Sequence, residues 1–96
     1  MNLIEKGRIE NLKDDDVFEN LGLEVLERDF SSFFVSNERG GRATAEKIKV
    51  KRNGAEIYLL KREEKIVSPY NGIGVDLFYF DTDFTRDQAR EFLDNV

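Results

Sequence analysis

The sequence predicts an α+β fold in a single domain, residues 1–96, built from a mostly antiparallel sheet of about four to six strands. A short helical N-terminal segment and a C-terminal helix packed on one face of the sheet complete the prediction. Three observations carry it: a hairpin signal at Asn53-Gly54, a nearly continuous apolar run over residues 75–80, and a capping box at Thr85. A chain of 96 residues with 40% apolar side chains can bury one core and is too short for two domains.

The hairpin signal also predicts a register. A two-residue type I′ turn at Asn53-Gly54 places Val50 opposite Ile57 and Lys49 opposite Tyr58. Side chains alternate between the faces of a strand, so one face of this hairpin is expected to be core and the other solvated. The expected core face carries Ile48, Val50, Ile57 and Leu59, and the expected solvated face carries Lys47, Lys49, Lys51 and Tyr58.

The other elements follow from shorter patterns. The run over 75–80 predicts a central strand covered on both faces, and Phe33-Phe34-Val35 predicts a further strand. The charged stretch 62–65 is interpreted as a turn. Near the N-terminus, residues 16–19 imitate a cap followed by a helical turn.

The C-terminal helix is expected from about Arg86 to Asn95. Thr85 and Gln88 can form a reciprocal capping box, in which each side chain bonds the other residue's amide. An apolar stripe at i, i+3, i+4 and i+7 follows the cap, and this stripe is expected to pack on the sheet. Its members are Ala89, Phe92, Leu93 and Val96.

Composition argues against an enzyme. The chain has no Cys and no His, which excludes thiolate chemistry and disulfides and removes the usual general base and the commonest metal ligand. The pair Asp81 and Asp83 lacks the other ligands of a calcium loop, and the triplet at 63–65 lacks the upstream acid of a metal-dependent nuclease. We therefore expect no catalytic residues, no metal site and no cofactor.

Hydropathy predicts where the protein works. No apolar run approaches the roughly 18–20 residues that span a bilayer, and the first residues lack the apolar core of a secretory signal. The expectation is a cytoplasmic protein without a membrane partner, located in the host cytoplasm if the gene is viral.

Charge is unevenly distributed along the chain. The net charge is −5, and an excess of acids over residues 10–29 contrasts with an excess of bases over residues 38–65. A dense carboxylate surface can occupy the basic groove of a nucleic-acid-binding protein. The alternative is that folding mixes the two signs into an ordinary solvated surface. The predicted partner-binding acids are Asp14, Asp15, Asp16, Glu19, Glu24 and Glu27.

The leading functional hypothesis follows from these acids and from the absence of catalytic residues. It is a small acidic binding protein that acts by occupying a protein partner with a basic surface, as an inhibitor or adaptor. Small domains of this type occur among phage-encoded antagonists of host nucleic-acid-binding proteins, such as anti-CRISPR proteins and DNA mimics.

The alternative hypothesis is a nucleic-acid-binding module. Alternate residues of a strand project from one face about 6–7 Å apart, which is close to a phosphate repeat, and an aromatic among bases suits single strands. An acidic chain is not typical of such proteins. A homodimer that buries an exposed strand edge is a further possibility. The residues of the predicted nucleic-acid site are Lys47, Lys49, Lys51, Arg52 and Tyr58.

Overall fold

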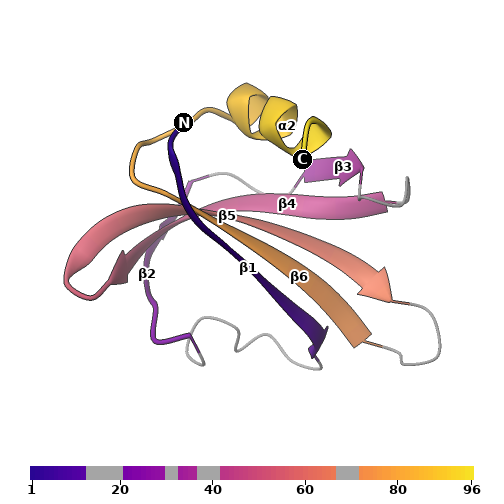
Figure 1. Cartoon of the computed structure of the whole chain (residues 1–96), viewed down its shortest axis with the longest axis horizontal. Coiled ribbons are helices and arrows are strands. Elements are labelled where there is room, and N and C mark those ends of the chain that lie inside the picture. The colour runs from indigo at the N-terminus through magenta and orange to yellow at the C-terminus, as the bar shows by residue number, and fades with distance from the viewer. Residues whose placement is uncertain (13–20, 30–32, 37–41, 67–71) are drawn as a thin grey trace.

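The computed structural model describes residues 1–12, 21–29, 33–36, 42–66 and 72–96, and places them in an antiparallel sheet with one C-terminal helix (Figure 1). The sheet order is β1-β6-β5-β4-β2, and β3 also pairs with β4. Helix α2 lies over one face of this sheet (Figure 1). The α+β prediction is thereby confirmed for the sheet and the C-terminal helix. The elements are β1 (Leu3–Leu12), β2 (Glu24–Arg28), β3 (Phe33–Ser36), β4 (Arg42–Arg52), β5 (Ala55–Ile66), β6 (Gly72–Phe80) and α2 (Arg86–Asp94).

The described N-terminal residues form a strand rather than a helix. Strand β1 pairs antiparallel with β6, so that Lys6 faces Phe78 and Arg8 faces Asp76. The sequence did not predict this strand, because its mixed polar residues show little alternation and its stability depends on a partner far along the chain. The helical signal at residues 16–19 lies outside the described residues, and no N-terminal helix occurs among those that are described.

The predicted hairpin is confirmed in its turn and its register. Asn53 and Gly54 have φ of 51° and 82°, the positive values that a type I′ turn requires, and Val50 pairs with Ile57. The turn expected at 62–65 is wrong, because β5 runs unbroken from Ala55 to Ile66. Arg62 lies within the strand opposite Asp76 of β6, and this ion pair lets a charged stretch remain in the sheet.

Each face of the sheet carries a buried core. Strand β6 confirms the prediction of a central strand, since every residue from Val75 to Phe80 is buried. The helix-side core contains Phe33, Val35, Ala43, Ala45, Leu60, Phe78, Phe80, Phe84, Ala89 and Leu93. The opposite core contains Leu23, Ile48, Val50, Leu59, Val75, Leu77 and Tyr79.

Helix α2 begins with the capping box that the sequence predicts. The backbone amide of Gln88 donates to Thr85 Oγ1 at 3.2 Å, and the backbone amide of Thr85 donates to Gln88 Oε1 at 2.8 Å. Ala89 and Leu93 are buried against the sheet as expected, whereas Val96 is exposed. The apolar stripe is therefore only partly covered.

A row of charged side chains crosses the helix-side face of β1, β6 and β5. Arg62 Nη2 lies 2.7 Å from the Asp76 carboxylate, and Arg8 Nη1 lies 2.9 Å from its other oxygen. Arg8 also reaches Glu64, at 2.6 Å. Gly74 makes this reach possible, because a Cβ at that position would lie 2.7 Å from Arg8 Nη2.

Replacing Gly74 by Ala should therefore lower the free energy of unfolding by less than about 1 kcal/mol, because the end of the flexible Arg8 side chain must shift away from the new methyl group and weaken its ion pair with Glu64. Urea denaturation would measure the change. In an Arg8→Ala background the same substitution should cost clearly less, since no guanidinium lies over the glycine. Equal costs in the two backgrounds would contradict this explanation of Gly74.

Candidate functional site

The structure places the described acids of the predicted partner site beside the lysines of the predicted nucleic-acid site. Asp14, Asp15, Asp16 and Glu19 lie outside the described residues. Glu24 and Glu27 lie on β2, where both are exposed. The register sets Glu24 opposite Lys51 and Glu27 opposite Lys49. Opposite charges facing each other across neighbouring strands attract, so these acids and lysines share one surface.

Lys47 does not lie on a solvated face. It is only 6% exposed, because its side of β4 is the side that helix α2 and Phe84 cover. Its Nζ lies 3.0 Å from Asp29, forms an ion pair with Asp83, and donates to the Phe84 carbonyl at 3.1 Å. Burial lowers the pKa of Lys47, and the hydrogen bonds to these two carboxylates raise it by more, so the pKa lies above its ordinary value.

Other residues of the predicted nucleic-acid site also have partners within the protein. Lys49 Nζ lies 3.8 Å from Glu56, and Arg52 pairs with Glu5 of β1. Tyr58 is half-buried with its ring 5.5 Å from Lys47 Nζ. Within the described part of the chain, folding mixes the acidic and basic segments instead of separating them.

The acids at the end of β6 also have partners. Asp81 accepts a hydrogen bond from Asn2 at 3.0 Å, and Asp83 accepts one from the Phe84 amide at 2.7 Å. The hydrogen bond from Lys47 lowers the pKa of Asp83 below its ordinary value. In the described segments, no group of three or more acids could hold a metal ion. These carboxylates therefore position the connection between β6 and α2.

An open hollow of about 450 Å³ lies beside Lys47, and its lining includes Asp29, Asp83 and Arg86. The Lys47 ammonium already forms ion pairs with both carboxylates within this hollow. Arg86 lies over the Phe33 ring, with its Cζ 5.5 Å from the ring centre. The hollow thus offers a ligand few charges that are not already engaged.

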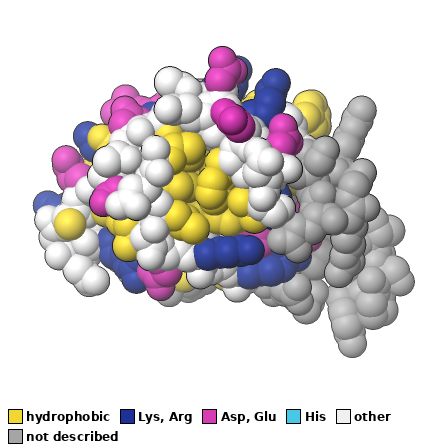
Figure 2. All heavy atoms as spheres, turned by 45° about the horizontal axis from the view of Figure 1, so that its top comes forward, with side chains coloured by type: hydrophobic (Ala, Val, Ile, Leu, Met, Phe, Trp, Pro, Cys, Tyr) yellow, Lys and Arg dark blue, Asp and Glu magenta, His cyan; other side chains and the backbone are white. Residues whose placement is uncertain are grey.

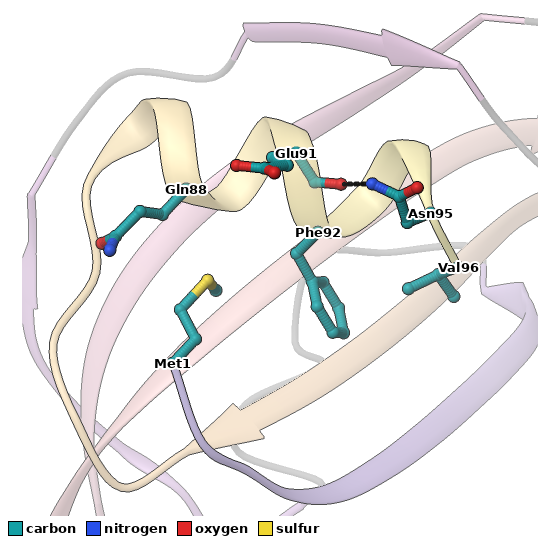
Figure 3. Close-up of a pocket in the computed structure, with 6 residues that line it drawn as sticks. All are labelled: Met1, Gln88, Glu91, Phe92, Asn95 and Val96. Carbon is teal, nitrogen blue, oxygen red and sulfur yellow. Dashed lines mark hydrogen bonds between the residues drawn. The ribbon is translucent and has the colours of Figure 1, made fainter.

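A different feature stands out on the helix side, where an apolar groove of about 360 Å³ lies between Met1, which precedes β1, and helix α2. Met1, Phe92 and Val96 turn their side chains toward this space (Figure 3). Met1 and Val96 are 43% and 44% exposed. In Figure 2 hydrophobic side chains form a patch near the middle of the face shown, with charged side chains around it. The remaining lining residues are Gln88, Glu91 and Asn95.

The floor of the groove is fixed by aromatic packing. The Phe92 ring lies 5.2 Å from the Phe78 ring and 5.2 Å from the Phe80 ring, edge to face in both cases. Phe78 and Phe80 are fully buried in the helix-side core. The Asn95 side chain donates to the Glu91 carbonyl at 2.7 Å, which ties the last turn of α2 beside the groove (Figure 3). The Phe92 ring at the floor of the groove is therefore held against the helix-side core.

The exposed side of α2 next to the groove is acidic. Asp87, Glu91 and Asp94 follow one another at i, i+4 and i+7, so they form one stripe along the helix, here called the acidic stripe. All three are exposed, and none of them forms an ion pair with the described residues. The groove is thus an apolar depression with the Glu91 carboxylate on its helix side, while Asp94 and Arg90 line a separate hollow on the β3 side of the helix.

Sequence reasoning missed this groove. The sequence predicts that Phe92 and Val96 pack on the sheet. Phe92 is only partly buried there, and Val96 is exposed. The available signal was the apolar Met1, Leu3 and Ile4 at the start of the chain, which are all exposed in the structure. The sequence could not show that this segment comes to lie beside the helix.

No protein-family model matches the chain, and the comparisons with curated proteins and with solved structures give no match either. Among the described residues no helix is long and apolar enough to cross a membrane. The site is therefore interpreted from its own geometry.

Proposed function

We propose that this protein is a small acidic binding protein that acts by occupying a protein partner with a basic surface, as an inhibitor or adaptor. A phage-encoded antagonist of a host nucleic-acid-binding protein is the type of molecule that this description fits. The observation that carries the proposal is the groove between Met1 and α2, in which Met1 and Val96 are exposed and the partly buried Phe92 forms the floor.

The physical support is the composition of this surface. Protein interfaces combine an apolar centre, which gains free energy by leaving water, with a polar rim. The groove has an apolar centre at Phe92, and Glu91 and Gln88 border it. Its floor does not need to rearrange, so less free energy is lost in ordering it on binding. The acidic residues predicted on β2 are less suited, because Glu24 and Glu27 already face lysines.

The nucleic-acid alternative receives less support from the geometry. Lys47 is buried between Asp29 and Asp83, and Arg52 is paired with Glu5. A phosphate backbone would have to displace these carboxylates before it could contact the bases. The groove in turn is bordered by acids, which repel phosphates.

Replacing Val96 by Asp should reduce capture of the partner about tenfold, because a carboxylate in the groove opposes burial of apolar surface. The experiment immobilises the protein, exposes it to a lysate of the source or host cells at low and high salt, and quantifies the captured protein by mass spectrometry. Val96 is exposed, so the thermal unfolding midpoint should remain near that of the unmodified chain.

Phe34→Asp is the matched control, since Phe34 is 69% exposed on β3 and does not line the groove. It introduces the same charge at another exposed apolar side chain and should leave capture unchanged. Equal capture by the Val96→Asp protein and the unmodified protein would show that the groove is not the binding site. Retention of nucleic acid that resists Val96→Asp would favour the alternative.

A further inference from the structure

We infer that the groove takes a segment of the partner protein in which a large apolar side chain is flanked by Lys or Arg. The inference rests on the proposed function and specifies its ligand. The groove of about 360 Å³ is small and open, which suits side chains from an exposed segment better than a folded surface inserted whole. Phe92 at its floor offers an aromatic ring to the incoming side chain.

The flanking charge follows from the acidic stripe. Glu91 belongs both to the stripe and to the lining of the groove, and Asp87 and Asp94 lie within one turn of it. These carboxylates form no ion pair with the described residues, so a cation brought beside them gains attraction without displacing a described partner. A segment with acidic flanks would instead meet like charge.

A second copy of this chain is a poorer occupant. A two-fold contact centred on the groove brings the same surface of two molecules together. Such a contact would place the acidic stripe of one copy beside the acidic stripe of the other, and Asp87, Glu91 and Asp94 would repel their equivalents. Charge complementarity therefore selects a different protein, with bases where this one has acids.

The test uses the full chain and synthetic peptides as probes. The first peptide has a central Phe-Leu pair between lysine flanks, the second replaces the central pair by Ala-Ala, and the third replaces the lysines by glutamates. Titration followed by amide NMR should show shifts at Gln88, Phe92, Asn95 and Val96 with the first peptide. The second and third peptides should each bind about tenfold more weakly.

Charge reversal on the protein provides the matched control. Glu91→Lys should weaken binding of the lysine-flanked peptide about tenfold, whereas Glu24→Lys, which changes the net charge equally but lies on β2, should not. Equal binding of the lysine and glutamate peptides, or equal effects of the two variants, would overturn the inference. Concentration-dependent dimerisation that Val96→Asp abolishes would overturn it in favour of a second copy.

The two proposals fail separately. If Val96→Asp abolishes capture of a cellular protein while the peptides show no preference for lysine flanks, the groove is the binding site but its ligand has another chemistry. If Val96→Asp has no effect on capture, the proposed function fails at this site whatever the peptides show.

Discussion

Replacing Asp76 by Asn should lower the free energy of unfolding by about 3–5 kcal/mol. Asp76 is 4% exposed and Arg62 is 2% exposed, and the Asp76 carboxylate accepts hydrogen bonds from Arg62 and from Arg8. Asn keeps the size of the side chain but removes the negative charge, so the buried Arg62 guanidinium loses its ion pair with the Asp76 carboxylate. Urea denaturation at neutral pH would measure the loss.

A paired replacement separates the charge from the packing. The double variant Arg62→Met, Asp76→Leu removes both charges, and it should be clearly more stable than Asp76→Asn alone, because the buried guanidinium is removed together with the carboxylate that it pairs with. A double variant as unstable as the single one would show that shape, and not charge pairing, makes this position important.

The same carboxylate gives the pH dependence a definite sign. Burial raises the pKa of Asp76, and the hydrogen bonds and charges of Arg62 and Arg8 lower it by more, so the pKa lies below its ordinary value. Its contribution to stability is therefore present above the pKa of the unfolded chain and is lost as the pH falls through the lower native pKa. As the pH falls, the difference in the free energy of unfolding between the unmodified protein and the Asp76→Asn variant should therefore become smaller.

Replacing Lys47 by Met should lower the free energy of unfolding by about 2–3 kcal/mol. Met fills a similar volume beneath Phe84, but it cannot donate to the Phe84 carbonyl or neutralise Asp29. Both groups would lose the buried Lys47 ammonium as a partner at the connection between β6 and α2. Thermal or urea unfolding would measure the change, with the fold checked by circular dichroism.

Asp83→Asn is the matched test at the other end of this contact. The Asp83 side chain is 62% exposed, so water can replace most of what Lys47 provides, and the loss should stay below about 1 kcal/mol. Losses of equal size at Asp83 and Lys47 would mean that the cost arises from their mutual ion pair alone. A negligible loss in Lys47→Met would show that the buried ammonium contributes nothing net.

The parts of the fold that sequence predicted are those set by neighbouring residues. The turn at Asn53-Gly54 needs two positive φ values, and Thr85 with Gln88 forms a complete cap within a few residues, so both signals are local. The apolar run over 75–80 predicts a strand whose two faces are both buried, and this prediction does not depend on which elements cover them. Each of these predictions depends on short-range geometry or on simple burial.

The errors concern contacts between distant residues. Arg62 was assigned to a turn because a charged stretch without partners favours solvent, and its partner Asp76 lies on another strand. Lys47 was assigned to a solvated face because Lys alternates with Val and Ile along the strand. Ala45 and Leu60, on the same face, were the residues that could have indicated a second core.

The position of the candidate site could not be predicted from the sequence. Charge and the missing catalytic residues suggested a binding protein, but the acids chosen on β2 face lysines across the strand register. The groove depends on the meeting of Met1 with Phe92 and Val96 from opposite ends of the chain. No local sequence pattern indicates that these residues lie side by side.

Hydrogen exchange of the protein with and without its captured partner tests the central claim most directly. If the groove between Met1 and α2 is the binding site, the partner should slow exchange at the amides of residues 2–5 and 88–96, and leave β2 and the turn at Asn53-Gly54 unchanged. Protection confined to β2, or to the basic residues of β4, with exchange in α2 unchanged, would contradict the claim.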